Sequence, residues 1–249
     1  MTRSTWVRLA IVVGAGAVLE LLCRTGVVPR LIVIPPSEMI ASGWQLLVSG
    51  VIKSDIYFSL ENIAAAIALS VAGGFLTGLA IYSVPALRAT LEPFLTSYSA
   101  VPPIVFYPML IVIFGLNRTP QILIAVMFGL VPMAINTING LHRIRPVLLK
   151  VGRVHRVSRM ASVFRIQLPA AAPYVFVGVT LAVSYSVIGV ISSEFILSAT
   201  GIGHQISFAY DNYDNRAMYG LIALLLVIAT LLNAALRGYS ERLLQGRAR

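Results

Sequence analysis

The sequence has few of the residues that build catalytic or metal centres. It contains one cysteine, Cys23, so an intrachain disulfide and a cysteine-based metal cluster are both excluded. Its three histidines are far apart, and the HExxH, GxSxG and P-loop lysine signatures are all absent. We therefore predict that this chain is not an enzyme, that it binds no cofactor or metal, and that energy for any active process comes from another polypeptide.

Charge is also scarce, and its sign is unbalanced. Only 11% of the 249 residues are charged, 58% are hydrophobic, and the mean hydropathy is +0.87, which together predict an integral membrane protein. The net charge of +10 does not indicate nucleic acid, because the basic residues are spread over loops and are not interleaved with stacking aromatics. We therefore expect the helices of this chain to be surrounded by membrane lipid.

Long apolar runs predict an all-α protein with six transmembrane helices, each of roughly 20 residues. They lie near residues 7–23, 60–82, 94–114, 121–138, 174–195 and 218–236. With both termini in the cytoplasm, only five of the nineteen basic residues are left outside: Arg24, Arg30, Lys53, Arg118 and Arg216. The positive-inside rule favours that topology. A secretory signal or a lipoprotein site at Cys23 is the alternative reading of the first run, but no small-residue cleavage pattern follows it.

After the first run, the prolines at positions 29, 35 and 36 predict an extended stretch. Ser37, followed by Glu38, is a candidate N-cap for an amphipathic helix that runs to about Ser49. We expect this helix to lie at the outer surface. Glu20, near the outer end of the first run, is assigned no role.

The loop at 139–173 is long and strongly basic. It contains no acid and seven basic residues: Arg143, Arg145, Lys150, Arg153, Arg156, Arg159 and Arg165. Such a segment is held on the cytoplasmic side, and a plain connection needs far fewer residues. The charges either enforce topology, contact a cytoplasmic partner, or do both.

The third run is interrupted by Pro102, Pro103 and Pro108, each of which removes a backbone donor. A helix broken in this way is expected to face protein or a wet cavity. Hydroxyl-bearing side chains stand around the breaks and are candidates for a translocation path: Ser97, Tyr98, Ser99 and Tyr107. A bent helix packed on its neighbours is the alternative. Asn136, at the end of the fourth run, either bonds a neighbouring helix or contacts the solute.

Glu194 follows a long uncharged run that ends at Ser193. The segment after it, with Gly201-Ile202-Gly203, must turn at the outer face. Acids inside spans are rare and are examined as functional groups. Glu194 either closes an outer gate, forms an ion pair with Arg216 or Arg118, or sits at the interface without a further role.

Six short motifs in a fixed order resemble one family. The sequence is similar to the permease subunits of bacterial ABC importers, in the branch for nitrate, taurine, aliphatic sulfonates, bicarbonate, aromatic acids or pyrimidine precursors. The motifs are Ile34-Pro35-Pro36-Ser37, Val101-Pro102-Pro103, Phe114-Gly115, Asn136-Thr137, Leu168-Pro169-Ala170-Ala171-Ala172-Pro173, and Ser193-Glu194 with Gly201-Ile202-Gly203.

The resemblance implies one permease domain over residues 1–249, with the type I importer fold, in the bacterial inner membrane. It implies a second permease subunit, an extracytoplasmic solute-binding protein near 34–49 and 201–215, and two ATPase subunits that carry the ATP and Mg²⁺. The cytoplasmic EAA loop would dock on the ATPase through a helix over 149–164. The implied coupling residues are Lys150, Arg153, Val154, Arg156, Val157, Arg159, Met160, Phe164, Leu168 and Pro169.

Within this loop the sequence departs from the family pattern. The Glu-Ala-Ala falls on Lys150-Val151-Gly152, and the glycine falls on Arg156. Because arginine disfavours positive φ, we expect either a more continuous helix or a turn moved to Gly152. The degenerate loop also leaves open whether the second permease is identical or different.

The predicted function is therefore that of a membrane subunit that forms half of an import path for a small polar or anionic solute. An ion-coupled secondary transporter or channel is the alternative. Such proteins bury several charges near the midplane and repeat their spans, and neither feature is found in this sequence.

Overall fold

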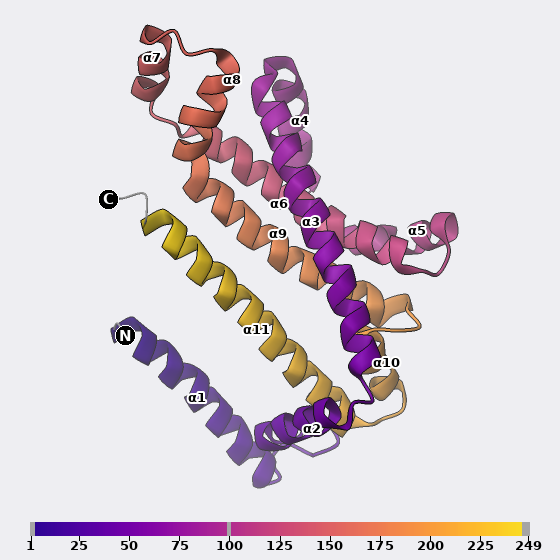
Figure 1. Cartoon of the computed structure of the whole chain (residues 1–249). Coiled ribbons are helices and arrows are strands. Elements are labelled where there is room, and N and C mark those ends of the chain that lie inside the picture. Colours follow the sequence, from indigo (N-terminus) through magenta and orange to yellow (C-terminus); the bar gives the residue numbers. More distant parts are fainter. Residues whose placement is uncertain (1–2, 99–100, 246–249) are drawn as a thin grey trace. The chain divides into compact units, whose positions relative to one another are not determined.

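The computed structural model describes residues 3–98 and 101–245, and its regular structure there is helical, which confirms the all-α prediction. Eleven α-helices and two short turns of other helix types follow one another along these residues (Figure 1). They are α1 (Arg3–Arg24), α2 (Pro36–Ser49), α3 (Lys53–Ser83), α4 (Pro85–Tyr98), the 3₁₀ turn η1 (Pro103–Phe106), α5 (Tyr107–Phe114), α6 (Arg118–His142), α7 (Pro146–Val154), α8 (Arg159–Ser162), the π turn η2 (Val163–Gln167), α9 (Leu168–Leu197), α10 (Ile202–Asp211) and α11 (Asn215–Gln245).

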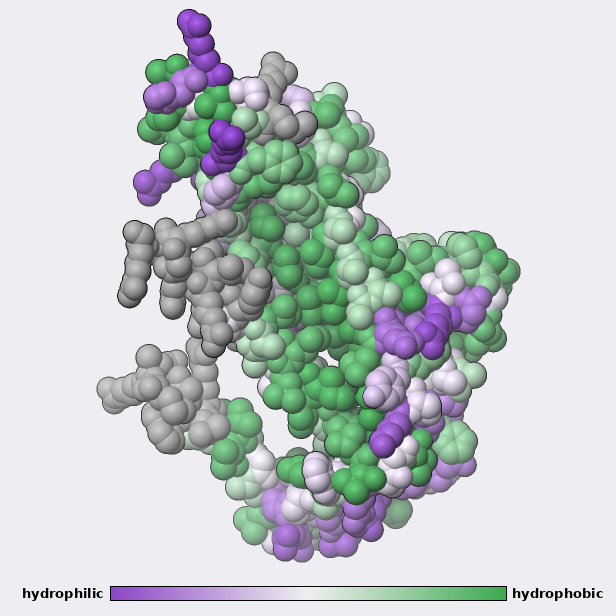
Figure 2. Space-filling model, viewed as in Figure 1, coloured by the Kyte–Doolittle hydropathy of each residue, from purple (hydrophilic) through white to green (hydrophobic). Residues whose placement is uncertain are grey.

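Among the residues that the structure describes, four helical segments are long and apolar enough to cross a membrane: Lys53–Ser83, Arg118–His142, Val163–Asp211 and Asn215–Leu236. They contain the predicted spans at 60–82, 121–138, 174–195 and 218–236. The predicted span at 7–23 lies within α1, and the one at 94–114 is divided among α4, η1 and α5. Hydrophobic side chains cover much of the face drawn in Figure 2, as a lipid-facing surface requires. The chain is a multi-pass membrane protein, while the count of six spans and their orientation stay predictions.

The chain forms two compact units. The first contains Met1–Phe58 and Glu194–Ile228, and the second contains Ser59–Ser193 and Ala229–Arg249. The boundaries between them fall inside α3, α9 and α11.

The core of the second unit is built where α3, α6 and α9 approach closely. Ile63, Ala66, Ala125 and Val190 form a buried cluster there. A Cβ on Gly189 would lie 2.5 Å from the Cα of Ala125, so only glycine allows this approach. Small residues suit helix contacts in lipid, because close packing replaces the hydrophobic effect as the driving force.

Buried polar side chains join the same helices of the second unit. The hydroxyls of Ser70 and Ser186 lie 3.1 Å apart, and Asn62 Nδ2 donates to Gln121 Oε1 at 2.8 Å. In a folded membrane protein one such interhelical bond contributes about 0.6 kcal/mol on average. These contacts therefore fix the register of α3 against α6 and α9 more than they add to stability.

In the first unit, Glu20 connects α1 to α2. Its carboxylate accepts from the backbone N–H of Ser37 at 3.0 Å, from the Ser37 hydroxyl at 2.7 Å, and from Arg24 Nε at 2.7 Å. The prediction that Ser37 caps α2 is wrong, because α2 begins at Pro36 and Pro35 is its N-cap residue. Proline suits the first helical position, since its missing N–H would have no intrahelical partner there. The Ser37 hydroxyl is thus available to Glu20.

Helix α2 also packs tightly on the start of α11. The Ser42 hydroxyl donates to the backbone carbonyl of Arg216 at 2.8 Å. A Cβ on Gly43 would lie 2.7 Å from the carbonyl oxygen of Gly220, so the two backbones touch without side chains between them. The amphipathic helix predicted after the first span is confirmed, and its place in the fold depends on this glycine contact.

Candidate functional site

The third predicted span is interrupted rather than bent. Helix α4 ends at Tyr98, Pro102 has an extended backbone at φ −62° and ψ 119°, and Pro103 opens the turn η1. Pro108 falls in the first turn of α5, where its missing N–H breaks no helical bond. Two adjacent prolines therefore separate two helical pieces.

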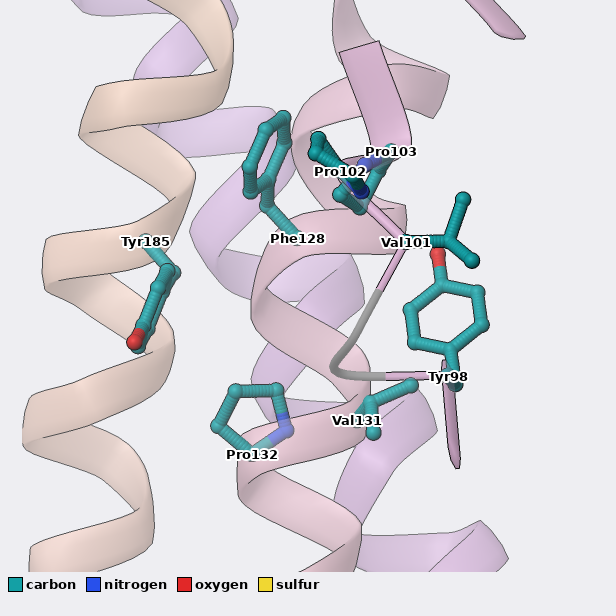
Figure 3. A pocket seen from close by; sticks show the side chains of 8 residues that line it. All are labelled: Tyr98, Val101, Pro102, Pro103, Phe128, Val131, Pro132 and Tyr185. Atoms are coloured by element: carbon teal, nitrogen blue, oxygen red, sulfur yellow. The ribbon is translucent and has the colours of Figure 1, made fainter. Parts of the chain in front are cut away.

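A cavity of about 190 Å³ lies at this interruption. Figure 3 shows its walls, which come from the segment after α4, from α6 and from α9. The lining residues are Tyr98, Val101, Pro102, Pro103, Phe128, Val131, Pro132 and Tyr185. The Tyr98 hydroxyl donates to the backbone carbonyl of Met127 at 3.4 Å, which holds its ring against α6.

Three of the residues predicted for the path, Tyr98, Pro102 and Pro103, are thus brought together around one cavity. Ser97 is exposed at the end of α4, and Ser99 lies outside the described residues. Tyr107 is 1% exposed and packs with Leu110 and Ile124. Its phenol therefore lies in a hydrophobic cluster, and a role in the path stays a prediction.

Asn136 donates from Nδ2 to the carbonyl of Pro132, four residues earlier in α6, at 2.8 Å. Its amide is thus used within its own helix, one turn from the cavity wall that Pro132 forms. This hydrogen bond shows neither of the two roles predicted for Asn136, which were a bond to a neighbouring helix and contact with the solute. Both roles stay predictions.

Phe128 and Tyr185 complete the cavity, and sequence reasoning missed both. Phe128 lies in a uniformly apolar run, where nothing distinguishes it from core. Tyr185 lies in the middle of a span without charged residues, but the hydroxyls of Ser184 and Ser186 flank it, so nothing in the sequence singled it out. Only the packing of α9 in the second unit brings it to residues 101–103.

The first unit contains a second polar constellation, at the start of α10. Glu194 is 0% exposed, and its Oε2 accepts from the backbone N–H of Gly203 at 3.0 Å. Asp55, from the first turn of α3, accepts from the Gly201 N–H at 2.8 Å and from Gln205 Nε2 at 2.9 Å. The first N–H groups of a helix have no intrahelical partner and carry partial positive charge, so two carboxylates stabilise this end.

Gly201 makes this arrangement possible. Its backbone has φ +108°, a conformation almost restricted to glycine. A Cβ there would lie 2.5 Å from Glu194 Oε2 and 2.6 Å from Oε1. Of the roles left open for Glu194, the structure shows a buried carboxylate that anchors α10, and a gate role stays a prediction. Arg118, one of its two candidate partners, forms an ion pair with Glu61. Ser193 is buried and donates to the carbonyl of Val190 at 2.8 Å.

The basic loop folds as a helix, a tight turn and a second helix. Helix α7 ends at Val154, and Arg156 adopts φ +51°. The Val157 N–H donates back to the carbonyl of Gly152 at 2.9 Å, which closes the six-residue ring of a Schellman turn. Ser158 then accepts from the Ala161 N–H at 3.3 Å and caps α8.

Both alternatives expected for this loop are therefore wrong. The helix is not continuous, and the turn is at Arg156 rather than at Gly152. Gly152 lies inside α7, where a Cβ would come within 2.8 Å of Ile166 Cδ1, so its small size serves packing. Arginine keeps the left-handed conformation because its side chain is exposed and two hydrogen-bonded caps define the turn.

Exposed valines form a stripe on α7. Val147, Val151 and Val154 are 65%, 48% and 79% exposed, and their spacing of four and three residues puts them on one helix face. Lys150 and Arg156 are exposed beside them, whereas the side chains of Arg153, Arg159 and Met160 lie outside the described part of the chain. Figure 2 shows hydrophobic and hydrophilic surface side by side over the segment that Figure 1 labels α7.

The second half of the loop borders an apolar groove. Phe164, which is 60% exposed, lines it together with Leu168 and Pro169 from the start of α9. The groove has a volume of about 290 Å³, and the other walls are Phe75, Ala172, Val175 and Phe176. Val157 is half-buried in the turn. The coupling role of these residues remains a prediction.

Residues 70–246 match the family described as binding-protein-dependent transport system inner membrane component. The chain belongs to this family. The match covers the second half of α3 and every helical element from α4 to α11, the basic loop included. The resemblance noted in the motifs is thereby confirmed, and the protein is a permease of an ABC importer.

Relatives of this permease belong to the same branch. It is 26% identical over 209 residues to the taurine transport system permease protein of Escherichia coli (strain K12), which covers 84% of this chain and 73% of that protein. It is 24% identical to the putative aliphatic sulfonates transport permease protein of Bacillus subtilis (strain 168), over 93% of this chain and 84% of the relative. It is also 24% identical to the nitrate import permease protein of Leptolyngbya laminosa, over 80% and 75%.

A solved structure shares the fold. The permease resembles a chain of the MetNI methionine ABC transporter in an inward-facing conformation, with a TM-score of 0.68 and 18% identity. The likeness covers 81% of this chain and 98% of that chain. The type I importer permease fold predicted from the motifs is therefore supported at the level of the fold.

Proposed function

We propose that this permease forms half of the translocation path of an ATP-driven importer and is moved by a separate ATPase through α7 and the turn at Arg156. The observation that carries the proposal is the valine stripe of α7, an exposed apolar face on a loop that is basic throughout. Exposed apolar surface of this kind marks protein or membrane contacts, and the basic residues beside the stripe favour a protein partner. A segment without acids, 139–173, is complementary to a groove lined by acidic residues.

The proposed partners follow from membership of the family. Two ATPase subunits supply ATP and Mg²⁺, a second permease supplies the other half of the path, and an extracytoplasmic solute-binding protein delivers the solute. Closure of the ATPases moves α7 together with α9, since Gly152 packs on Ile166 in the turn that leads directly into α9. A rigid-body change between two packed states then opens the path alternately to each side.

We assign the cavity at Pro102 and Pro103 to that path, with its lining residues as part of the path wall. The helix is broken at these prolines, and a broken helix in a membrane is tolerated only against protein or a wet cavity. The names of the relatives support small anionic solutes as the class of substrate, among them taurine, sulfonates and nitrate. The α10 segment held by Asp55 and Glu194 is the proposed outer closure.

The substitution Val154→Asp tests the coupling assignment. It puts a carboxylate into the most exposed position of the stripe, where it would be buried against the partner and repelled by its acids. Burying a valine contributes roughly 1.5–3 kcal/mol, so losing that contact and adding an unpaired charge should reduce association with the ATPase by at least about tenfold. Co-purification of the ATPase and ATP-driven uptake in proteoliposomes are the measurements.

The matched control is Val48→Asp on α2, a valine that is 66% exposed outside the loop. It should leave the association unchanged. Normal ATPase co-purification with the Val154 variant would remove α7 from the coupling interface. Uptake by the permease alone, without any ATPase, would instead favour an ion-coupled transporter.

A further inference from the structure

We infer that the cavity beside Pro102 and Pro103 selects organic anions that carry their charge on an apolar body, and disfavours small inorganic anions such as nitrate or bicarbonate. The inference rests on the proposed function, because it assigns a substrate class to the proposed wall of the path. It concerns the permease itself rather than the binding protein that delivers the solute.

The chemistry of the wall carries the inference. None of the eight described lining residues has a formal charge, and six of them are purely apolar. Two phenols, Tyr98 and Tyr185, provide the polar groups. An anion without an apolar part would give up hydration against this wall, and the eight lining residues offer no cation to replace it, which is unfavourable. An organic anion can place its apolar body against the wall and leave its charged end in the wet part of the path.

The two phenols differ in what they can offer a solute. The Tyr98 hydroxyl donates to the Met127 carbonyl. For the Tyr185 hydroxyl, which belongs to a half-exposed side chain of α9, the described residues provide no hydrogen-bond partner. Figure 3 shows Tyr185 on α9, across from Pro102, with Phe128 between them in this view and Pro132 lower on α6. Tyr185 is therefore the donor available to a sulfonate or carboxylate oxygen in this cavity.

The shape of the wall adds selectivity. Prolines at positions 102, 103 and 132 have fixed φ, and the ring of Phe128 has only two rotatable angles. Such a wall loses little conformational entropy when a solute contacts it. A volume of about 190 Å³ corresponds to roughly six waters, at about 30 Å³ each, so a single small organic molecule fills it.

The test uses the assembled complex of the permease with its ATPase subunits in detergent, without the binding protein, and two probes. Benzenesulfonate presents an apolar ring and an anionic group, and nitrate presents charge alone. We expect titration calorimetry to show benzenesulfonate binding at least about tenfold more tightly than nitrate, since the ring buries apolar area that nitrate lacks.

Substitutions locate the binding. Phe128→Ala should weaken benzenesulfonate by about tenfold, because the ring contact is lost. Tyr185→Phe should weaken it by roughly threefold, because one hydrogen bond is lost while the apolar surface remains. The control Phe94→Ala removes an exposed phenylalanine of α4 that does not line the cavity, and binding should stay within about twofold. Intact association with the ATPase verifies that each variant is folded.

Any of three outcomes would overturn the inference. Nitrate binding as tightly as benzenesulfonate would reject the substrate class. Unchanged benzenesulfonate affinity in both Phe128→Ala and Tyr185→Phe would place its site elsewhere. Absence of benzenesulfonate binding, with a lipid acyl chain retained in the cavity by mass spectrometry, would make the cavity a lipid contact. A different result would contradict the proposed function itself, namely that no ATPase associates with the chain.

Discussion

Among the residues with positive φ in the permease, Arg156 and Gly201 obey different constraints. At Arg156, between α7 and α8, φ is +51° and the side chain is exposed. At Gly201, before α10, φ is +108° and a Cβ would meet the carboxylate of Glu194. The first turn accepts an arginine. The second excludes any side chain, because both the backbone and the surrounding atoms reject it.

The difference shows that a residue with a side chain can adopt positive φ when the space around its Cβ is open, and cannot when that space is filled by other atoms. A non-glycine residue with positive φ costs about 1–2 kcal/mol, which two hydrogen-bonded caps can offset. A buried position adds the cost of a steric clash and of displaced hydrogen bonds, which a folded structure cannot relax easily. A side chain is therefore tolerated at the turn of the basic loop, whereas none is tolerated at Gly201 before α10.

The largest expected effect comes from Gly201→Ala. The substitution should lower stability by at least about 3 kcal/mol, because it combines backbone strain with a clash against Glu194. The measurement is the thermal unfolding midpoint in detergent, together with ATP-driven uptake. Gly26→Ala is the matched control, since Gly26 has φ +78° but no atom within 4 Å of a new Cβ. It should cost only about 1 kcal/mol, and equal effects of the two substitutions would refute the comparison.

A smaller effect is expected at Asp55, which supports the turn from α3. Asp55→Ala leaves the buried N–H of Gly201 without its acceptor and should cost about 2 kcal/mol. Asp55→Asn keeps one carbonyl oxygen for Gly201, and Gln205 can turn its amide to match, so it should cost less than about 1 kcal/mol. The measurement is the thermal unfolding midpoint of each variant, compared with that of the unmodified permease. An asparagine variant as unstable as the alanine variant would show that the negative charge, rather than the hydrogen bond, stabilises α10.

The smallest effect is expected at Arg156, and two substitutions separate its backbone role from its charge. Both Arg156→Asn and Arg156→Ala remove the charge, but asparagine tolerates positive φ better than alanine does. The asparagine variant should therefore be more protected against local opening, by roughly 0.5–1 kcal/mol. Hydrogen exchange of residues 146–162 measures this protection. Identical exchange in the two variants would mean that the Schellman turn is not populated in solution.

The local features of the fold were predictable. The apolar runs at 60–82, 121–138, 174–195 and 218–236 lie inside long helices, because hydropathy over about 20 residues is a local property. The prolines at 102 and 103 interrupt the third span as expected, since a missing N–H acts within one turn. The helix after the first span was also expected, although its first residue and the role of Ser37 were not.

The prediction for the turn in the basic loop was wrong for an identifiable reason. The intrinsic preference of arginine was taken to decide the backbone, whereas the Ser158 cap and the Val157 bond to Gly152 outweigh it. The space around Gly152, which Ile166 fills, could not be known without the fold. The candidate path was half predictable: Tyr98 and the prolines were found from the break, and Phe128 and Tyr185 were not.

By itself, the sequence determined that this protein is embedded in a membrane, where its helices break, and which family of importers it belongs to. Composition, the length of apolar runs and short motifs are local properties of the sequence, and they do not depend on how the helices pack. Only the tertiary structure decided that Asp55 and Glu194 share the start of α10, and that Tyr185 faces the same cavity as Pro102. Residues more than 80 positions apart meet only when helices pack, and close packing through small residues such as Gly189 chooses which faces touch.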